Sequence, residues 1–140
     1  MIIRSRRLWI TVLVVCLMAS AVIAGFTYSF LSPNSTRNRA SAMECTLNWG
    51  RLAVLPATTS NLTISTEGSM LSRAFRVSFL ASTEDIERWL ADSPGTHAIT
   101  PTVPARGVRH FDIAPGGGAA HAEVDVDDTS HRVSIYVYWS

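Results

Sequence analysis

Apolar residues dominate the first part of the chain. From Leu8 to Leu31 the sequence LWITVLVVCLMASAVIAGFTYSFL carries no charged side chain. As a helix that rises about 1.5 Å per residue, this run would be long enough to cross a hydrocarbon core of about 30 Å. The pattern therefore predicts a single N-terminal transmembrane helix, with a short Arg-rich tip before it.

The flanks of this run indicate its orientation. Arg4, Arg6 and Arg7 precede it, and basic residues before a span favour a cytoplasmic N-terminus. A cleaved secretory signal peptide is the competing interpretation, because small residues up to Ala24 offer cleavage sites. The apolar run continues past those sites, which favours a retained anchor. We expect the rest of the chain to lie outside the cytoplasm, tethered to the lipid bilayer through residues 8–31 or secreted after cleavage.

Polar residues follow the apolar run. Residues 32–43 are rich in Ser, Asn and Arg and have little to bury, so we expect a spacer there, with a folded domain over residues 44–140. Within that domain apolar positions recur at short intervals, and alternation of this kind is typical of half-buried strands. The strands expected in its first half are residues 52–55, 62–65 and 75–80.

A helical period follows the third of these strands. Ser82 is a good helix N-cap, and Ile86, Trp89 and Leu90 fall at i, i+3 and i+4, so they form one apolar stripe. A Ser-Pro-Gly sequence at 93–95 ends the segment. We expect one helix of about three turns on one face of a sheet. The residues that follow contain prolines and no period, which indicates a loop.

Three consecutive glycines, at positions 116–118, separate two alternating stretches. A phosphate-binding loop would lead into a helix, but the residues after the glycines alternate with period two. The pattern therefore predicts a β-hairpin. Its expected register places Asp112 opposite His121 and His110 opposite Glu123.

The last stretch of the chain alternates in the same way. Pairing Asp127 with Arg132 brings the apolar residues of the two strands opposite each other, which completes a three-stranded C-terminal meander. Trp139 is then expected to face the core near Trp89. The predicted fold class is α+β: an N-terminal transmembrane helix, then a small antiparallel sheet of about five or six strands with one helix packed on one face.

The opposite face of the meander collects polar side chains. Imidazoles and carboxylates from adjacent strands are zinc ligands, although such pairs are also ordinary on solvated sheets. No HExxH spacing or cysteine pair supports a metal site, so no cofactor is expected. Tyr136 and Tyr138 on this face are the predicted interaction surface. The residues that a metal site would use are His110, Asp112, His121 and Glu123.

Charge and cysteine content restrict the chemistry further. From Ser32 onward the chain carries nine arginines against eleven acidic residues, a formal charge of −2, which argues against a nucleic-acid partner. Cys45 has no second cysteine in the domain for a disulfide, and a buried thiol is the expected state rather than a nucleophile. No Ser or Cys nucleophile is spaced with a histidine and an acid as a catalytic triad requires.

Three functions are compatible with these features. The first is a non-catalytic, membrane-anchored extracytoplasmic interaction or accessory domain, with an envelope protein as its partner. The second is a small extracytoplasmic metal-dependent enzyme that uses the His/carboxylate face of the sheet. The third is a structural subunit of a membrane complex. The missing catalytic constellation favours the first.

Overall fold

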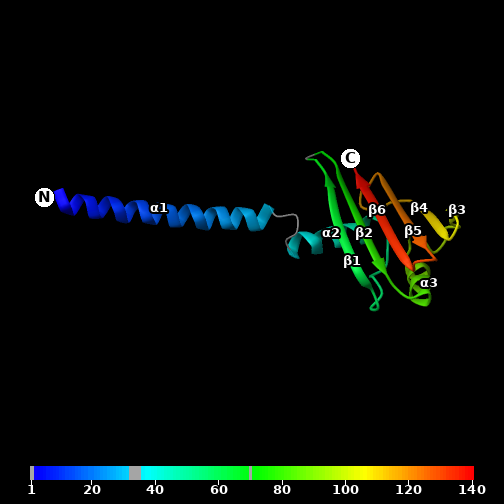
Figure 1. The fold of residues 1–140 in the computed structure, drawn as a ribbon. Coiled ribbons are helices and arrows are strands. Elements are labelled where there is room, and N and C mark those ends of the chain that lie inside the picture. Colours follow the sequence, from blue (N-terminus) through cyan, green and yellow to red (C-terminus); the bar gives the residue numbers. More distant parts are fainter. Residues whose placement is uncertain (1, 32–35, 70) are drawn as a thin grey trace. The chain divides into compact units, whose positions relative to one another are not determined.

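A computed structural model describes residues 2–31, 36–69 and 71–140 of the chain (Figure 1). The chain divides into two compact units, Met1–Asn38 and Arg39–Ser140. Helix α1 (Ile2–Leu31) belongs to the first unit, and its side chains are described for residues 12–28. The second unit holds a mixed arrangement of strands and helices, so its α+β class agrees with the prediction.

The structure contradicts the predicted transmembrane anchor over residues 8–31. The segment is helical, but no helix among the described residues is long and apolar enough to cross a membrane. The prediction used length and lack of charge alone, whereas a crossing takes about 20 predominantly apolar residues. The predicted single-pass localisation is not supported either.

The second unit contains one antiparallel sheet, which has six strands among residues 39–69 and 71–140. Its order is β1-β2-β6-β5-β4-β3, so the C-terminal strand β6 lies between β2 and β5 (Figure 1). The predicted antiparallel sheet and its C-terminal meander are thus confirmed. The strands are β1 (Ser60–Gly68), β2 (Arg73–Leu80), β3 (Thr102–Ala105), β4 (Val108–Ile113), β5 (His121–Asp127) and β6 (Arg132–Trp139).

The registers within the meander agree with the prediction in one hairpin and differ in the other. All predicted pairs of β5 with β6 are present. Between β4 and β5 the pairing is displaced by two positions, so Asp112 lies opposite Glu123 and His110 lies opposite Asp125. Because side chains alternate with period two, this displacement keeps every residue on its expected face.

The loop between β4 and β5 explains the displacement. Residues 114–120 lie outside both strands, and the N–H of Gly116 donates to the carbonyl of Trp49 at 2.7 Å. Gly117 and Gly118 have φ values of 60° and 80°, a region that glycine adopts readily. A Cβ on Gly117 would lie 2.6 Å from Cδ1 of Trp49. The glycines therefore let the loop pack against the end of a helix, and a simple hairpin pattern does not show that contact.

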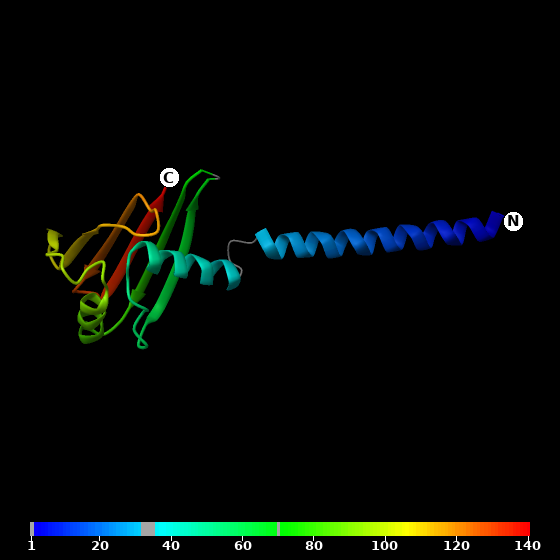
Figure 2. The same ribbon diagram turned by 180° about the vertical axis from the view of Figure 1, so that it is seen from behind.

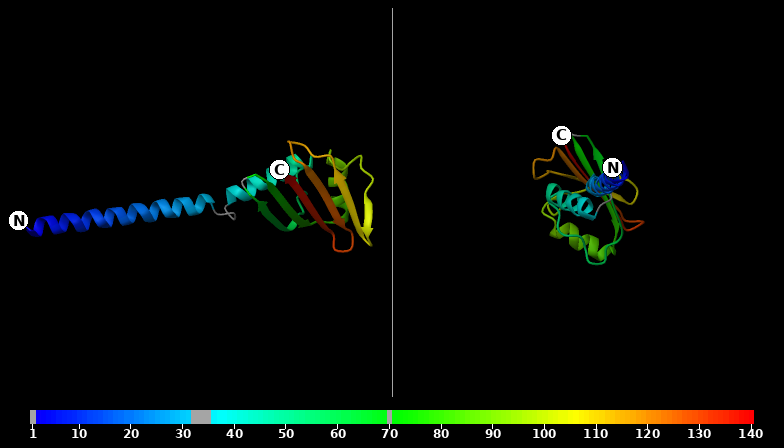
Figure 3. Two further views of the ribbon diagram at one scale, coloured as in Figure 1. Left: turned by 90° about the horizontal axis from the view of Figure 1, so that it is seen from above. Right: turned by 90° about the vertical axis from the view of Figure 1, so that its left-hand side faces the viewer.

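Two helices, rather than the predicted one, cover the same face of the sheet in the part of the chain described here (Figures 2 and 3). Helix α3 (Thr83–Asp92) begins after Ser82, whose hydroxyl accepts from the N–H of Asp85, and it buries the predicted stripe of Ile86, Trp89 and Leu90. Helix α2 (Thr36–Trp49) includes residues expected to be spacer, because their polar composition hid a buried side. Ala42 and Thr46 on that side are buried.

The segment 52–55, predicted as a strand, has no strand geometry. The N–H of Leu52 donates to the backbone carbonyl of Leu47, and the backbone of Ala53 is paired with side chains. The N–H of Ala53 donates to the hydroxyl of Ser93 at 2.9 Å, and its carbonyl accepts from the indole Nε1 of Trp89 at 3.0 Å. The apolar residues of this segment therefore do not reflect strand pairing: Leu52 is buried in the core, whereas Val54 is 83% exposed.

Two further local predictions are wrong. Thr102–Ala105, expected in a loop, pairs with β4 as strand β3. Trp139, expected in the core, is 39% exposed, because it lies at the end of β6 opposite Arg73, beyond the main apolar cluster. That cluster combines inward residues of the strands with residues of α2 and α3 and with Leu52. Its fully buried large side chains include Phe79, Val77, Ile86, Val124, Val126, Val133, Ile135 and Val137.

Candidate functional site

The face of the sheet opposite α2 and α3 is polar and carries no helix in the described unit (Figure 3). We call it the open face. Its residues alternate with the core residues along each strand, so the same pattern that fills the core also selects them. It comprises Thr63, Ser65, Arg76, Ser78, His110, Asp112, His121, Glu123, Asp125, Ser134, Tyr136 and Tyr138.

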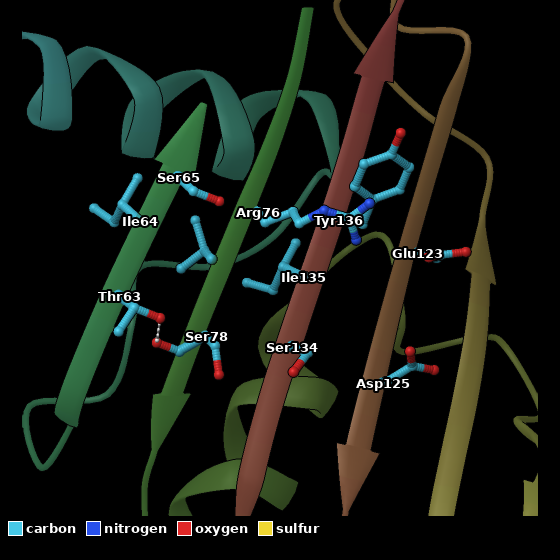
Figure 4. A pocket seen from close by; sticks show the side chains of 11 residues that line it. Thr63, Ile64, Ser65, Arg76, Ser78, Glu123, Asp125, Ser134, Ile135 and Tyr136 are labelled. Atoms are coloured by element: carbon cyan, nitrogen blue, oxygen red, sulfur yellow. Dashed lines mark hydrogen bonds between the residues drawn. The ribbon is translucent and has the colours of Figure 1, made fainter. Parts of the chain in front are cut away.

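A shallow groove of about 350 Å³ crosses the open face over β1, β2, β6 and β5 (Figure 4). Its floor consists of strand residues whose side chains are short, because Ser78 lies opposite Ser134 in the central pair. Longer side chains stand around this low centre. The polar residues that line the groove are Thr63, Ser65, Arg76, Ser78, Glu123, Asp125, Ser134 and Tyr136.

Tyr136 is held by side chains from both neighbouring strands. Arg76 on β2 lies opposite Tyr136 and places its guanidinium carbon 4.3 Å from the ring centroid, as in a cation–π contact (Figure 4). The Nε of the same guanidinium donates to Glu67 at 3.3 Å. On β5 the ring of His121 has its centroid 6.2 Å from that of Tyr136. The tyrosine therefore presents a preoriented ring beside the groove.

Two histidine–carboxylate pairs occupy the β4–β5 side of the open face. Nδ1 of His110 lies 2.7 Å from a carboxylate oxygen of Asp125, across the strands. Nε2 of His121 lies 3.0 Å from a carboxylate oxygen of Glu123, two residues along the same strand. Each histidine thus meets an acid, as the sequence indicated. The partners differ from the predicted ones because of the displaced β4–β5 register.

The environment of His110 favours its protonated form. The hydrogen bond to Asp125 raises the pKa of His110 above its usual value, and burial opposes this to a lesser degree. The negative charges of Asp125, Glu123 and Asp112 act in the same direction as the hydrogen bond. The His110–Asp125 pair is therefore an ion pair at mildly acidic pH.

The four residues named as metal candidates do not converge. His110 is bonded to Asp125, His121 is bonded to Glu123, and Asp112 lies opposite Glu123. Across the described residues, no group of three or more His, Cys, Asp or Glu side chains is placed to hold a metal ion. Cys45 is half-buried on α2 against the core and lies apart from the open face.

Sequence reasoning placed the tyrosines and the histidine–acid residues on the correct face of the sheet but did not name Thr63, Ser65, Arg76 and Ser78, which also line the groove. Arg76 and Ser78 alternate visibly with core residues, so their outward direction could be expected. Their position beside Tyr136 and Ser134 depends on β2 pairing with β6. No local pattern specifies which strand lies beside which, so the basic and hydroxyl side of the groove emerged only with the sheet order.

No protein-family model, no curated protein and no solved structure matches the chain.

Proposed function

We propose that the protein is a non-catalytic interaction module that binds a partner protein through the open face. The observation that carries this proposal is the groove beside Tyr136. Arg76 fixes the orientation of the Tyr136 ring in the unbound protein. Tyrosine and arginine are enriched where interfaces gain most of their affinity. A ring that is already oriented loses little conformational freedom on binding, which favours recognition.

The charges around the groove indicate the chemistry of that partner. Glu123 and Asp125 line it, and each has a histidine as its side-chain partner. A carboxylate has room for further hydrogen bonds beside one imidazole. Asp112 adds a third acid next to Glu123. In contrast, the guanidinium of Arg76 is engaged by Glu67. The β4–β5 side therefore favours a partner segment with arginine or lysine side chains.

The exposure of the histidines supports recognition over acid–base chemistry. General acids and bases in enzymes are usually tuned by a site that excludes water. The side chain of His121 is 42% exposed on an open sheet. An exposed imidazole at this position can form hydrogen bonds with a partner protein.

The test is a titration of the full chain with a fluorescent oligo-arginine peptide, followed by fluorescence polarisation. Replacing Glu123→Gln together with Asp125→Asn should weaken binding by about tenfold, because two charge-assisted contacts to the peptide are lost. The matched control is Glu84→Gln with Asp92→Asn, which removes the same charge from exposed positions of α3, on the other side of the sheet from the groove. Equal weakening by both double variants would mean that only net charge attracts the peptide, and the groove would have no specific role.

The tyrosines provide a second test of the same proposal. The double variant Tyr136→Ala with Tyr138→Ala should weaken peptide binding while the melting temperature changes by only a few degrees, since both side chains are half-buried. Unchanged binding in this variant would exclude the ring as a contact residue.

A further inference from the structure

The two edges of the sheet are built differently. Strand β3 has four residues, contains Pro104, and pairs irregularly with β4 between Thr102 and Ala105. Proline cannot donate a backbone hydrogen bond, and short irregular edges resist pairing with another chain. Strand β1 has nine residues, no proline and no lysine, and all but one of its residues are exposed. One edge is therefore protected and the other is not.

Strand β1 retains a regularly paired segment, and among the described residues no strand lies beside its outer edge. Its pairing with β2 is continuous from Thr63 to Gly68, and β1 is the terminal strand in the sheet order. The one irregularity lies before Thr63, where Asn61 has a φ of 49°. The one charged residue of β1, Glu67, is bonded to Arg76 of β2. Its charge is therefore partly neutralised and does little to prevent another strand from pairing with this edge.

We propose that a second copy of this chain pairs with β1 in antiparallel orientation, so that one sheet continues through both copies. A two-fold axis at Ser65 places Ile64 opposite Thr66 and Thr63 opposite Glu67. Residues on the open face then meet residues on the open face, as continuous sheets require. The two Glu67 carboxylates lie at opposite ends of the contact, and the pair of β-branched residues is favourable.

This pairing also extends the groove. Thr63 and Ser65 line it and belong to the edge strand, so the partner's open face begins where this groove reaches β1 (Figure 4). Backbone hydrogen bonds at the edge would supply affinity, and the self-complementary side chains would select a second copy. The inference rests on the edge alone and stands independently of the proposed peptide recognition.

Disulfide trapping in the full chain tests the register. Residues directly opposite in antiparallel strands have Cα atoms about 4.5 to 5.5 Å apart, within the range that a disulfide spans. With Cys16→Ser and Cys45→Ser as background, Ser65→Cys should form a covalent dimer under mild oxidation. Thr63→Cys should do so far less, because its expected neighbour is Glu67. Val103→Cys on β3, where the native side chain is 64% exposed, is the control for chance collisions.

Charge variants provide the second arm. Ser65→Lys and Ser65→Glu each place like charges at the two-fold axis, so each alone should be monomeric by light scattering, whereas their mixture should form a heterodimer. Circular dichroism checks that both variants fold. A monomeric wild-type chain at all concentrations, or equal trapping at positions 63, 65 and 103, would overturn the proposal. Because all variants carry the same α1, association through that helix cannot produce the positional difference.

Discussion

The covered and open faces of the sheet consist of alternate residues of the same strands, yet they have different physical roles. Along β6, Val133, Ile135 and Val137 are at most 2% exposed under the helices, while Ser134 and Tyr136 between them are partly accessible. Burial of an aliphatic side chain contributes about 1.5 to 3 kcal/mol, whereas an exposed cross-strand pair contributes about 0.2 to 1 kcal/mol. Stability should therefore reside on the covered face, which leaves the open face free for recognition.

Polar groups differ between the two faces in the same sense. On the covered side they satisfy each other within the fold: the indole Nε1 of Trp89 donates to Ala53, and the hydroxyl of Thr96 donates to Leu90 at 2.7 Å. Buried polar groups need such partners because water cannot reach them. On the open face the carboxylates pair with histidines and remain accessible. The partner of a polar group therefore depends on whether the group faces the helices or the solvent.

The largest effect is expected at Trp89 on the covered face. Its side chain is 3% exposed and packs edge-to-face on Phe79, with ring centroids 5.6 Å apart. Trp89→Ala should lower the free energy of unfolding by about 3 to 5 kcal/mol, measured by urea denaturation. Trp139→Ala is the matched control at the strand end and should cost well under half of that. Similar losses in both variants would contradict the assignment of Trp139 to the periphery.

A smaller loss is expected at Arg109, the charged residue at the border of the covered face. Its guanidinium bonds to Asp128 at 2.8 Å and to Glu87 of α3, so it links the sheet to the helix. Arg109→Met should destabilise the domain by about 1 to 2 kcal/mol, since charged hydrogen bonds are lost while the stem's packing is kept. The wild-type advantage should shrink in high salt. A salt-independent difference would point to packing instead.

On the open face, Tyr136 should matter less for stability. Tyr136→Leu removes the ring that Arg76 covers but keeps an apolar side chain. The expected loss in unfolding free energy is about 0.5 to 1 kcal/mol, the scale of an exposed cation–π contact. Arg76→Gln should produce a similar loss, and the double variant should show less than the sum of both. A loss at Tyr136 as large as that at Trp89 would remove the distinction between the two faces.

The smallest effect is a pH dependence at His110. Because its pKa is raised in the folded state, protonation stabilises the fold. This contribution is fully present below the unfolded pKa of about 6.5 and is lost as the pH rises through the folded pKa. We expect less than about 1 kcal/mol, given the exposure of Asp125. Unfolding measured across this window should show a flatter profile for His110→Gln, and an unchanged profile would exclude the pair as its source.

Local patterns identified the parts of the candidate site that lie on the meander. His110, Asp112, His121 and Glu123 and the two tyrosines all occupy the expected face, because alternation decides the direction of a side chain. Local patterns also predicted the N-cap at Ser82 and the apolar stripe of α3 correctly. In contrast, the predicted span in α1 was wrong, since freedom from charge alone does not establish a membrane crossing.

The periods and turns of neighbouring residues were enough to predict which residues of the meander share a face, where α3 begins, and how β5 pairs with β6. The position of β6 between β2 and β5, which brings Arg76 to Tyr136 and forms the groove, followed only from the folded domain. The tertiary structure also placed α2 on the core and Trp139 outside it. Such contacts join segments distant in sequence, and their free energy depends on packing and loop closure across the whole domain, which no local pattern encodes.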